Sequence, residues 1–202
     1  MKSTKQTVIP RPSKAEVEKY LAVYNNEMPD YVKQENSINK LFNKTYSANT
    51  DLDDILAKAS VLNDFYSTNI FKILPVAEKI LDADFDKRIK KHDFTLVNEI
   101  ADVNIGGKKR NLYSFASKYC AHHAIDIYPI FDSYVEKMLK HFRKADKFAD
   151  FKNEELKKYP RFHEILLDFR RFYGLDDFSL RDIDHYLWLA GKQEFGKEYK
   201  KK

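Results

Sequence analysis

The chain has 202 residues, 43% hydrophobic and 14% aromatic, so it can bury one substantial core but is too short for several independent domains. Its formal charge of +5 permits a polyanionic partner without requiring one. The single Cys120 excludes an internal disulfide and an all-cysteine metal cluster; with no secretion signal or membrane-spanning run in the sequence, this predicts a cytoplasmic protein.

Apolar residues recur at spacings of three and four along nearly the whole chain, which predicts an all-α fold of ten or eleven short helices. Ser13 suits the N-cap of a first helix, and the break at 28–30 precedes a second. Acidic residues at 51–54 suit the start of a third, and further helices are expected around 76–81, 85–92 and 94–102.

The pair Gly106-Gly107 interrupts this pattern and predicts a tight turn. Helices are then expected from residue 112 to the break at 126–130, around 135–142, at 146–158 and through 165–169. A last helix should run over 180–190, with Ser179 as its cap and Gly191 ending it. We expect a single helical globule of two interlocked lobes over 1–202.

Residues 106–139 read GGKKRNLYSFASKYCAHHAIDIYPIFDSYVEKML, which resembles the helix-hairpin-helix DNA glycosylases, most closely their adenine-specific branch. In that family a glycine-bearing hairpin opens a helix, and a proline-containing loop then delivers a catalytic aspartate. The resemblance places Asp132 as that aspartate and Ser114 where bifunctional members carry a Schiff-base lysine. It implies a glycosylase-like fold with a helix-hairpin-helix region over about 93–143.

Residues 61–80 are similar to the family segment that enters the duplex beside the target base. Thr68 fits a threonine of that segment, whereas Tyr66 and Ser67 stand in place of two glutamines. The resemblance makes these three residues candidates for a wedge or for the wall of a base pocket.

Three departures from the family pattern narrow what the resemblance implies. The hairpin glycines are adjacent and displaced by a few residues, Leu62 stands where adenine-specific members keep a second acid, and the iron–sulfur cysteines are missing. The implied activity is monofunctional excision of a damaged or mispaired base, with Asp132 and Ser114 in the catalytic site and no cofactor.

Physical chemistry gives these residues consistent roles. Breaking an N-glycosidic bond develops positive charge on the sugar, which a nearby carboxylate stabilises, and the nucleotide must first flip out of the stack. Backbone N–H groups after the glycine turn, at the start of the next helix, suit a phosphate. The residues expected to contact DNA are Gly106, Gly107, Lys108, Lys109, Arg110, Asn111 and Lys118.

Simpler interpretations fit the same residues. Asp132 is well placed for an ordinary N-cap, Ser114 for solvent, and the basic turn for an exposed loop. Adjacent His122 and His123 point to different helix faces, so no metal site is expected. The competing hypotheses are a non-catalytic module that binds nucleic acid or protein, and a helical protein unrelated to DNA.

Overall fold

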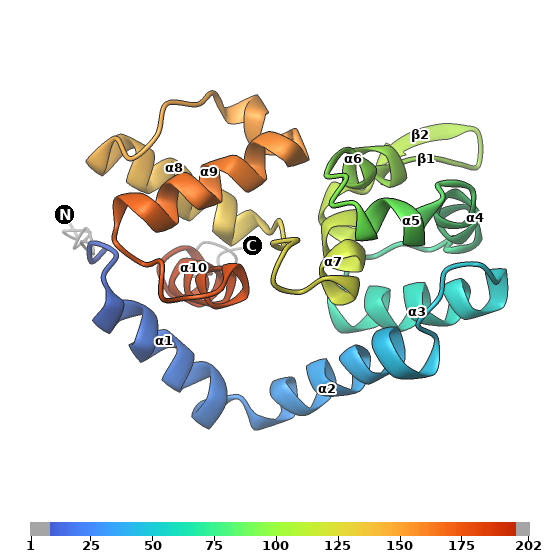
Figure 1. Ribbon diagram of the computed structural model, residues 1–202, viewed down its shortest axis with the longest axis horizontal. Coiled ribbons are helices and arrows are strands. Elements are labelled where there is room, and N and C mark those ends of the chain that lie inside the picture. The colour runs from blue at the N-terminus through green and yellow to red at the C-terminus, as the bar shows by residue number, and fades with distance from the viewer. Residues whose placement is uncertain (1–8, 197–202) are drawn as a thin grey trace, which may run out of the picture.

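The computed structural model describes residues 9–196, which form a mainly helical fold, as the periodicity predicts (Figure 1). A short π-helical turn, Leu41–Thr45, extends α2, and a 3-10 helix, Asn153–Lys157, precedes α9. No helix within the described range has the length and apolar character needed to cross a bilayer. The α-helices are α1 (Lys14–Glu27), α2 (Pro29–Lys40), α3 (Leu52–Phe65), α4 (Leu74–Asp82), α5 (Phe85–Lys90), α6 (Thr95–Ala101), α7 (Tyr113–His123), α8 (Ser133–Asp146), α9 (Tyr159–Phe172) and α10 (Leu180–Phe195).

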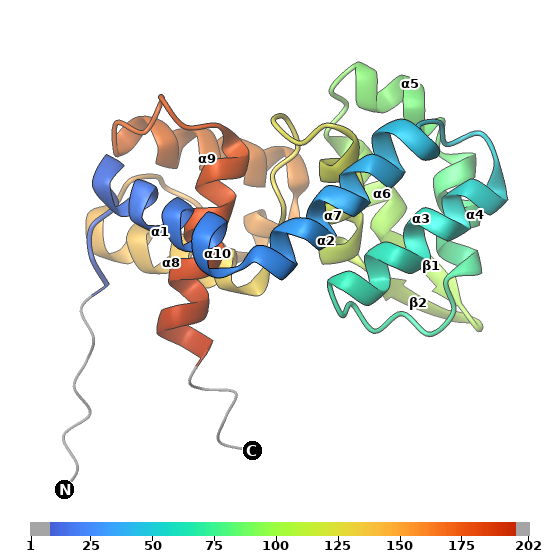
Figure 2. The same cartoon turned by 90° about the horizontal axis from the view of Figure 1, so that it is seen from below.

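The helices form two lobes, and α2 lies across them (Figures 1 and 2). One lobe contains α1, α8, α9 and α10, with α10 packed against both α1 and α8. The other contains α3 to α7, with α3 against α4 and α6 against α7. The chain therefore leaves the first lobe after α1 and returns to it only with α8, so the two ends of the described chain belong to the same lobe.

Side-chain caps begin several helices where the sequence predicts them. The Ser13 hydroxyl accepts a hydrogen bond from the backbone N–H of Glu16 (3.3 Å), and Ser179 and Asp182 form a reciprocal capping box. Asp51 caps α3 by accepting from the backbone N–H of Asp53 (2.9 Å). Each cap satisfies an N–H group that the first helical turn leaves without a partner.

The predicted tight turn is confirmed, but it belongs to a β-hairpin. Gly106 and Gly107 have φ angles of +60° and +79°, which a two-residue hairpin turn needs and glycine adopts without strain. They join β1 (Asp102–Ile105) to the antiparallel β2 (Lys108–Asn111). The next helix, α7, begins at Tyr113, close to the expected start at 112, but the N–H groups directly after the turn belong to β2, which pairs with β1, and not to a helix start.

The expected charged helix over 146–158 is present only as the 3-10 helix Asn153–Lys157. Helix α8 ends at Asp146, and Lys147 takes a left-handed conformation with φ of +53°. Phe148 and Phe151 are buried beyond it, with their ring centroids 5.9 Å apart. Burial of these two rings therefore overrides the local helix propensity of the segment.

Gly191 does not end α10, which continues to Phe195. It is buried where α10 crosses α8, and a Cβ atom added there would lie 2.8 Å from the Cβ of Tyr134 and 3.0 Å from its carbonyl oxygen. Gly191 therefore allows the close approach of two helix backbones.

We expect Gly191→Ala to destabilise the protein by about 1–3 kcal/mol, because the added methyl must push α8 and α10 apart. Urea unfolding measures the change. Gly196→Ala is the control, since its Cβ would lie 3.7 Å from the nearest atom, an ordinary contact. Equal stability of the two variants would contradict this account of the helix crossing.

Candidate active-site pocket

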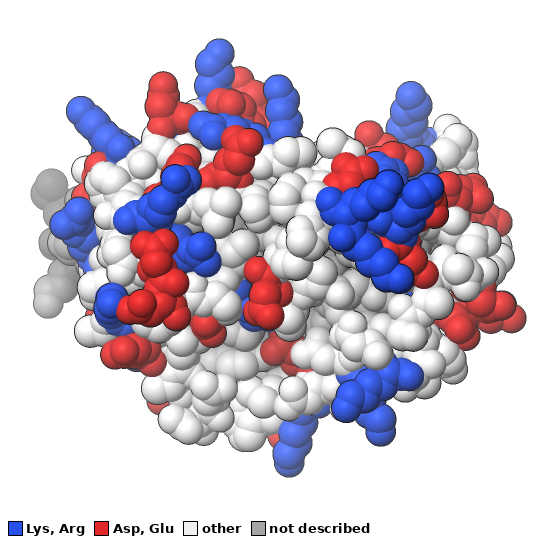
Figure 3. Space-filling view, viewed as in Figure 1, with Lys and Arg blue, Asp and Glu red and all other residues white. Residues whose placement is uncertain are grey.

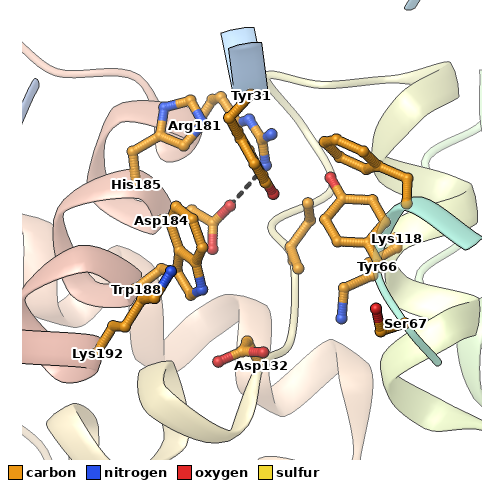
Figure 4. Close-up of a pocket in the computed structure, with 12 residues that line it drawn as sticks. Tyr31, Tyr66, Ser67, Lys118, Asp132, Arg181, Asp184, His185, Trp188 and Lys192 are labelled. Atoms are coloured by element: carbon orange, nitrogen blue, oxygen red, sulfur yellow. Dashed lines mark hydrogen bonds and ion pairs between the residues drawn. The ribbon is translucent and has the colours of Figure 1, made fainter. Parts of the chain in front are cut away.

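A cavity of about 300 Å³ lies between the two lobes (Figure 4). One wall comes from α10 and contains Arg181, Asp184, His185, Trp188 and Lys192. The facing wall comes from the end of α3, from α7 and from the loop before α8, and contains Phe65, Tyr66, Ser67, Lys118, Ile130 and Asp132. Tyr31 of α2 completes the lining, so all three parts of the fold contribute to the cavity.

The loop that carries Asp132 is held by two serines of α7. The Ser114 hydroxyl donates to the carbonyl oxygen of Phe131 (3.1 Å), and the Ser117 hydroxyl accepts from the N–H of Phe131 (3.0 Å). Tyr159 of α9 donates to the carbonyl of Pro129 in the same loop (2.7 Å). Because the backbone on both sides of Phe131 is bonded, the next residue has a fixed place at the cavity.

Asp132 is both an N-cap and a cavity residue. Its Oδ1 accepts from the N–H of Tyr134 (2.7 Å) at the start of α8, which confirms the capping interpretation. Its Oδ2 has no hydrogen-bond partner within residues 9–196, and Figure 4 shows the carboxylate beside the open centre of the cavity. One oxygen thus fixes the side chain and the other remains for a ligand.

Lys118 lies inside the protein, although it was expected on a DNA-facing surface. Its Nζ donates to the Ser114 hydroxyl (2.6 Å) and stands 5.0 Å from the centre of the Tyr66 ring. Burial lowers the pKa of this amine, while the carboxylates of Asp132 and Asp184 favour its charged form. An amine and a carboxylate therefore share one side of the cavity.

Tyr66 forms a wall of the cavity, the second of the two roles predicted for it. Its hydroxyl is 3.0 Å from Nε2 of His122, whose Nδ1 is 2.7 Å from Oδ1 of Asn39. Burial lowers the pKa of His122 to about 3, so the neutral ring bridges the two partners. Within the described residues no group of histidine, cysteine or carboxylate side chains is arranged to hold a metal.

A second hollow, of about 340 Å³, adjoins the cavity and shares Tyr66, Ser67, Lys118 and Asp132 with it. Its lining adds three more residues that the sequence singled out, namely Thr68, Asn111 and Ser114. The remaining ones lie outside both hollows, on the exposed hairpin: Gly106, Gly107, Lys108, Lys109 and Arg110. The structure thus brings most of the predicted site together and separates the basic turn from it.

The α10 wall was missed by the sequence interpretation. Oδ2 of Asp184 accepts from Nη1 of Arg181 (2.7 Å), and Arg181 also forms an ion pair with Glu35 of α2. Burial raises the pKa of the Asp184 carboxyl to about 7, with Asp132 adding to the effect and Arg181 opposing it. Trp188, one turn further on, stacks on Tyr31 with ring centroids 5.2 Å apart. The spacing of Asp184 and Trp188 was the available signal, but it also fits a buried helix.

Two exposed features lie on the lobe of α3 to α7. Phe71, in the loop between α3 and α4, is 97% exposed, and Nζ of Lys72 lies 3.9 Å from where a Cβ on Gly106 would stand. Figure 3 shows basic side chains gathered over α5, which carries Lys87 and Lys90. Lys72 and Phe71 therefore lie near the hairpin, whereas Figure 2 places α5 with its cations at the opposite side of this lobe.

The comparisons with known proteins place the chain in a family. The model described as HI_0787_N, N-terminal domain, matches residues 16–127, which is more than half of the chain, and the chain belongs to that family. It is similar to an uncharacterized protein of Haemophilus influenzae, with 48% identity over 149 residues that cover 73% of this chain and 71% of the relative. No solved structure matches the chain. The family segment includes Tyr66 and Lys118 but ends before Asp132.

The raised pKa of Asp184 predicts a specific dependence of stability on pH. Between its usual value of 3.8 and about 7, the unfolded side chain has released its proton while the folded one keeps it. The free energy of unfolding therefore falls through this range as pH rises, and the effect is complete above about pH 7. The free energy of unfolding of Asp184→Asn should not fall in this way. The variant should therefore become more stable relative to the parent as pH rises.

Urea unfolding of both proteins at several pH values from about 4 to 8 measures the difference. Glu194→Gln, in the last turn of the same helix and outside the cavity lining, is the control. A parallel pH dependence in parent and Asp184→Asn would mean that the carboxyl titrates normally.

Proposed function

We propose that the protein is a monofunctional DNA N-glycosylase that excises a damaged or mispaired base, with Asp132 as its catalytic carboxylate. The observation that carries the proposal is the position of Asp132. Its Oδ2 stands without a partner, within residues 9–196, where an aromatic cavity meets a hollow that reaches the hairpin strand at Asn111. The resemblance of residues 106–139 to helix-hairpin-helix DNA glycosylases supports the same assignment.

The cavity suits a single nucleobase. About 300 Å³ is at the lower end of the range for small-molecule sites, so a large cofactor is a poor fit. Phe65 and Tyr66 on one side and Trp188 on the other supply aromatic surface for stacking, as pockets for flipped bases require. A base inserted here leaves its glycosidic bond near the mouth, on the side of Asp132.

In the reaction, the base departs with the electrons of the glycosidic bond and positive charge develops on the sugar. The Asp132 carboxylate stabilises that charge and accepts a proton from the water that attacks C1′. The N–H of Tyr134 bonds to Oδ1 of Asp132 and so holds the carboxylate at the start of α8. Ser114 acts here as a positioning residue, through its bonds to Phe131 and Lys118.

The hairpin and the loop after α3 supply the surface for the duplex. Lys108, Lys109 and Arg110 are exposed and suited to phosphates. Phe71 has the exposure of an apolar wedge, which enters between base steps and occupies the space of a flipped nucleotide. The resemblance to the glycosylases suggested a wedge within Tyr66–Thr68. In this proposal the wedge is instead Phe71, a few residues further along the chain.

Asp132→Asn should lower base excision by on the order of a hundredfold or more, since the amide keeps the cap but loses the charge. Stability should change by less than about 1 kcal/mol and DNA binding should survive. The assay is single-turnover release of base from duplexes carrying a panel of damaged and mispaired purines. Asp51→Asn is a matched control, because Asp51 caps α3 in the same way outside the cavity lining.

Borohydride trapping on the same duplexes tests the monofunctional assignment. Attack by water leaves no imine, so no covalent complex should form. A trapped complex that disappears in Lys118→Met would instead assign the Lys118 amine as the nucleophile. Parent protein that binds these duplexes but releases no base would favour the non-catalytic module.

Changing Lys108, Lys109 and Arg110 together to Glu should weaken duplex binding and reduce its salt dependence, because fewer counterions are released. Phe71→Ala should weaken binding without altering the salt dependence. Fluorescence anisotropy over a salt series measures both. Charge reversal at exposed Lys144, Lys152 and Lys158 of the other lobe is the control. If it weakened duplex binding equally, the hairpin would not be a specific DNA-binding surface.

A further inference from the structure

Asp184 has an unusual environment for a carboxylate. The side chain is almost completely buried, with 3% of the residue exposed, yet it lines the cavity on the wall opposite Tyr66 and Lys118 (Figure 4). Oδ2 is bonded to Arg181, whereas Oδ1 has no hydrogen-bond partner within residues 9–196. The free oxygen is therefore available to whatever fills the cavity.

Arg181 fixes the orientation of the Asp184 side chain from the side away from the cavity centre. Arg181 lies between it and Glu35 of α2, and Glu35 in turn accepts a hydrogen bond from the hydroxyl of Tyr24. One guanidinium thus serves two buried carboxylates, so Asp184 is only partly neutralised. Burying a carboxylate in this way costs stability, which an apolar side chain at the same place would avoid.

We propose that Asp184 is the base-reading residue of the pocket and that it selects a purine with the Watson–Crick edge of guanine. The inference rests on the proposed function, because it treats the cavity as a base pocket. It differs from what the family resemblance implies, because the most similar branch of the glycosylases is specific for adenine.

The chemistry of the edges favours guanine. Above its pKa of about 7 the Asp184 side chain is ionised, and an ionised carboxylate only accepts hydrogen bonds. Guanine presents the ring N1–H and the exocyclic amine side by side, so a donor reaches Oδ1 in either of two adjacent positions. Adenine presents the N1 lone pair beside its amine, and thymine presents N3–H between two carbonyl oxygens, so each places a repelled lone pair against the carboxylate.

The two walls then have separate tasks. Asp184 and Trp188 on α10 bind the far edge and the face of the base, whereas Asp132 stands at the sugar. A donor from the base stabilises the charged form of Asp184, which its buried surroundings disfavour before the base enters. A base without that donor leaves the buried carboxylate without a hydrogen bond. The free-energy cost of this unpaired carboxylate is what discriminates against such a base.

Trp188 gives a direct measurement, because it is the single tryptophan of the chain and lines the cavity. Its fluorescence is followed while parent protein is titrated with 2′-deoxyguanosine or 2′-deoxyadenosine, with free tryptophan as the inner-filter control. We expect deoxyguanosine to bind with a preference of about tenfold. Equal binding, a preference for deoxyadenosine, or no response to either nucleoside would overturn the proposal.

Asp184→Asn should then reverse or abolish the preference, because an amide offers an acceptor and a donor side by side, the pattern that adenine matches. Glu194→Gln should keep the preference of the parent. If Asp184 had only a structural role, Asp184→Asn would weaken the binding of both nucleosides alike and leave the ratio of their affinities unchanged. That result would also overturn the proposal.

Excision is measured separately, on duplexes with 8-oxoguanine or 8-oxoadenine, which carry the same change at C8 and differ in the Watson–Crick edge. Loss of 8-oxoguanine selectivity in Asp184→Asn, on the order of tenfold or more, would support the proposal within the catalytic reaction. A protein that reads deoxyguanosine through Asp184 but excises neither base keeps this inference and refutes the proposed glycosylase activity.

Discussion

The site depends on the pair of hydrogen bonds that joins α7 to the backbone of Phe131. Ser114 and Ser117 are three residues apart, so they lie on one face of the helix, and together they bond the carbonyl and the N–H of the same residue. The connection between the two lobes is thereby held on α7 immediately before α8 begins. Without it, the starting point of α8 and the carboxylate that caps it have no fixed position relative to Lys118 and Tyr66.

The same bonds explain why a polar face of α7 is buried. Ser117, Lys118 and His122 are each less than 5% exposed, although a polar stripe ordinarily faces water. Each has a specific partner: Phe131 for Ser117, Ser114 for Lys118, and Asn39 with Tyr66 for His122. Buried polar groups of this kind are tolerated because they are bonded, and here they connect α7 to the interlobe loop and to α2.

The lobe of α1, α8, α9 and α10 is connected to α2 through ion pairs. Arg181 of α10 pairs with Glu35 of α2 and with Asp184 of its own helix, all of them buried. Above this cluster, Tyr31 stacks on Trp188 and lies 4.7 Å from the ring of Phe65, so α2 contacts both walls of the cavity. A shift of α2 would therefore change the cavity on both sides at once. The width of the pocket is determined by this helix more than by either lobe alone.

Local chemistry was readable from the sequence, and long-range geometry was not. The caps at Ser13 and Ser179, the acidic helix start at 51–54 and the turn at Gly106-Gly107 depend on neighbours within a few residues, and they were predicted correctly. Asp132 and Tyr66, which the resemblance singled out in two separate segments, line the same cavity, and their roles there stay a prediction.

The role of Gly191 was misread because the atom that requires glycine belongs to Tyr134, in another helix. The α10 wall was missed for a related reason. A buried aspartate and tryptophan one turn apart look alike in sequence whether they face a core or a cavity, and only the packing of α10 against α2 and α8 decides between them.

The charged residues that suit phosphate binding and the carboxylates proposed for catalysis and base reading lie in different parts of the protein. Two carboxylates, Asp132 and Asp184, line the cavity beside three cations, Lys118, Arg181 and Lys192, so the cavity has no large net charge to attract a phosphate backbone. In the proposed function, the binding energy for a polyanion comes from the lobe of α3 to α7, where the hairpin presents Lys108, Lys109 and Arg110 outside the cavity. Distance matters, because exposed charges are screened beyond about 8–10 Å at physiological salt, whereas buried ones are screened much less. In the proposed function, the exposed basic hairpin therefore holds the strand by its backbone, and the cavity receives only the flipped base.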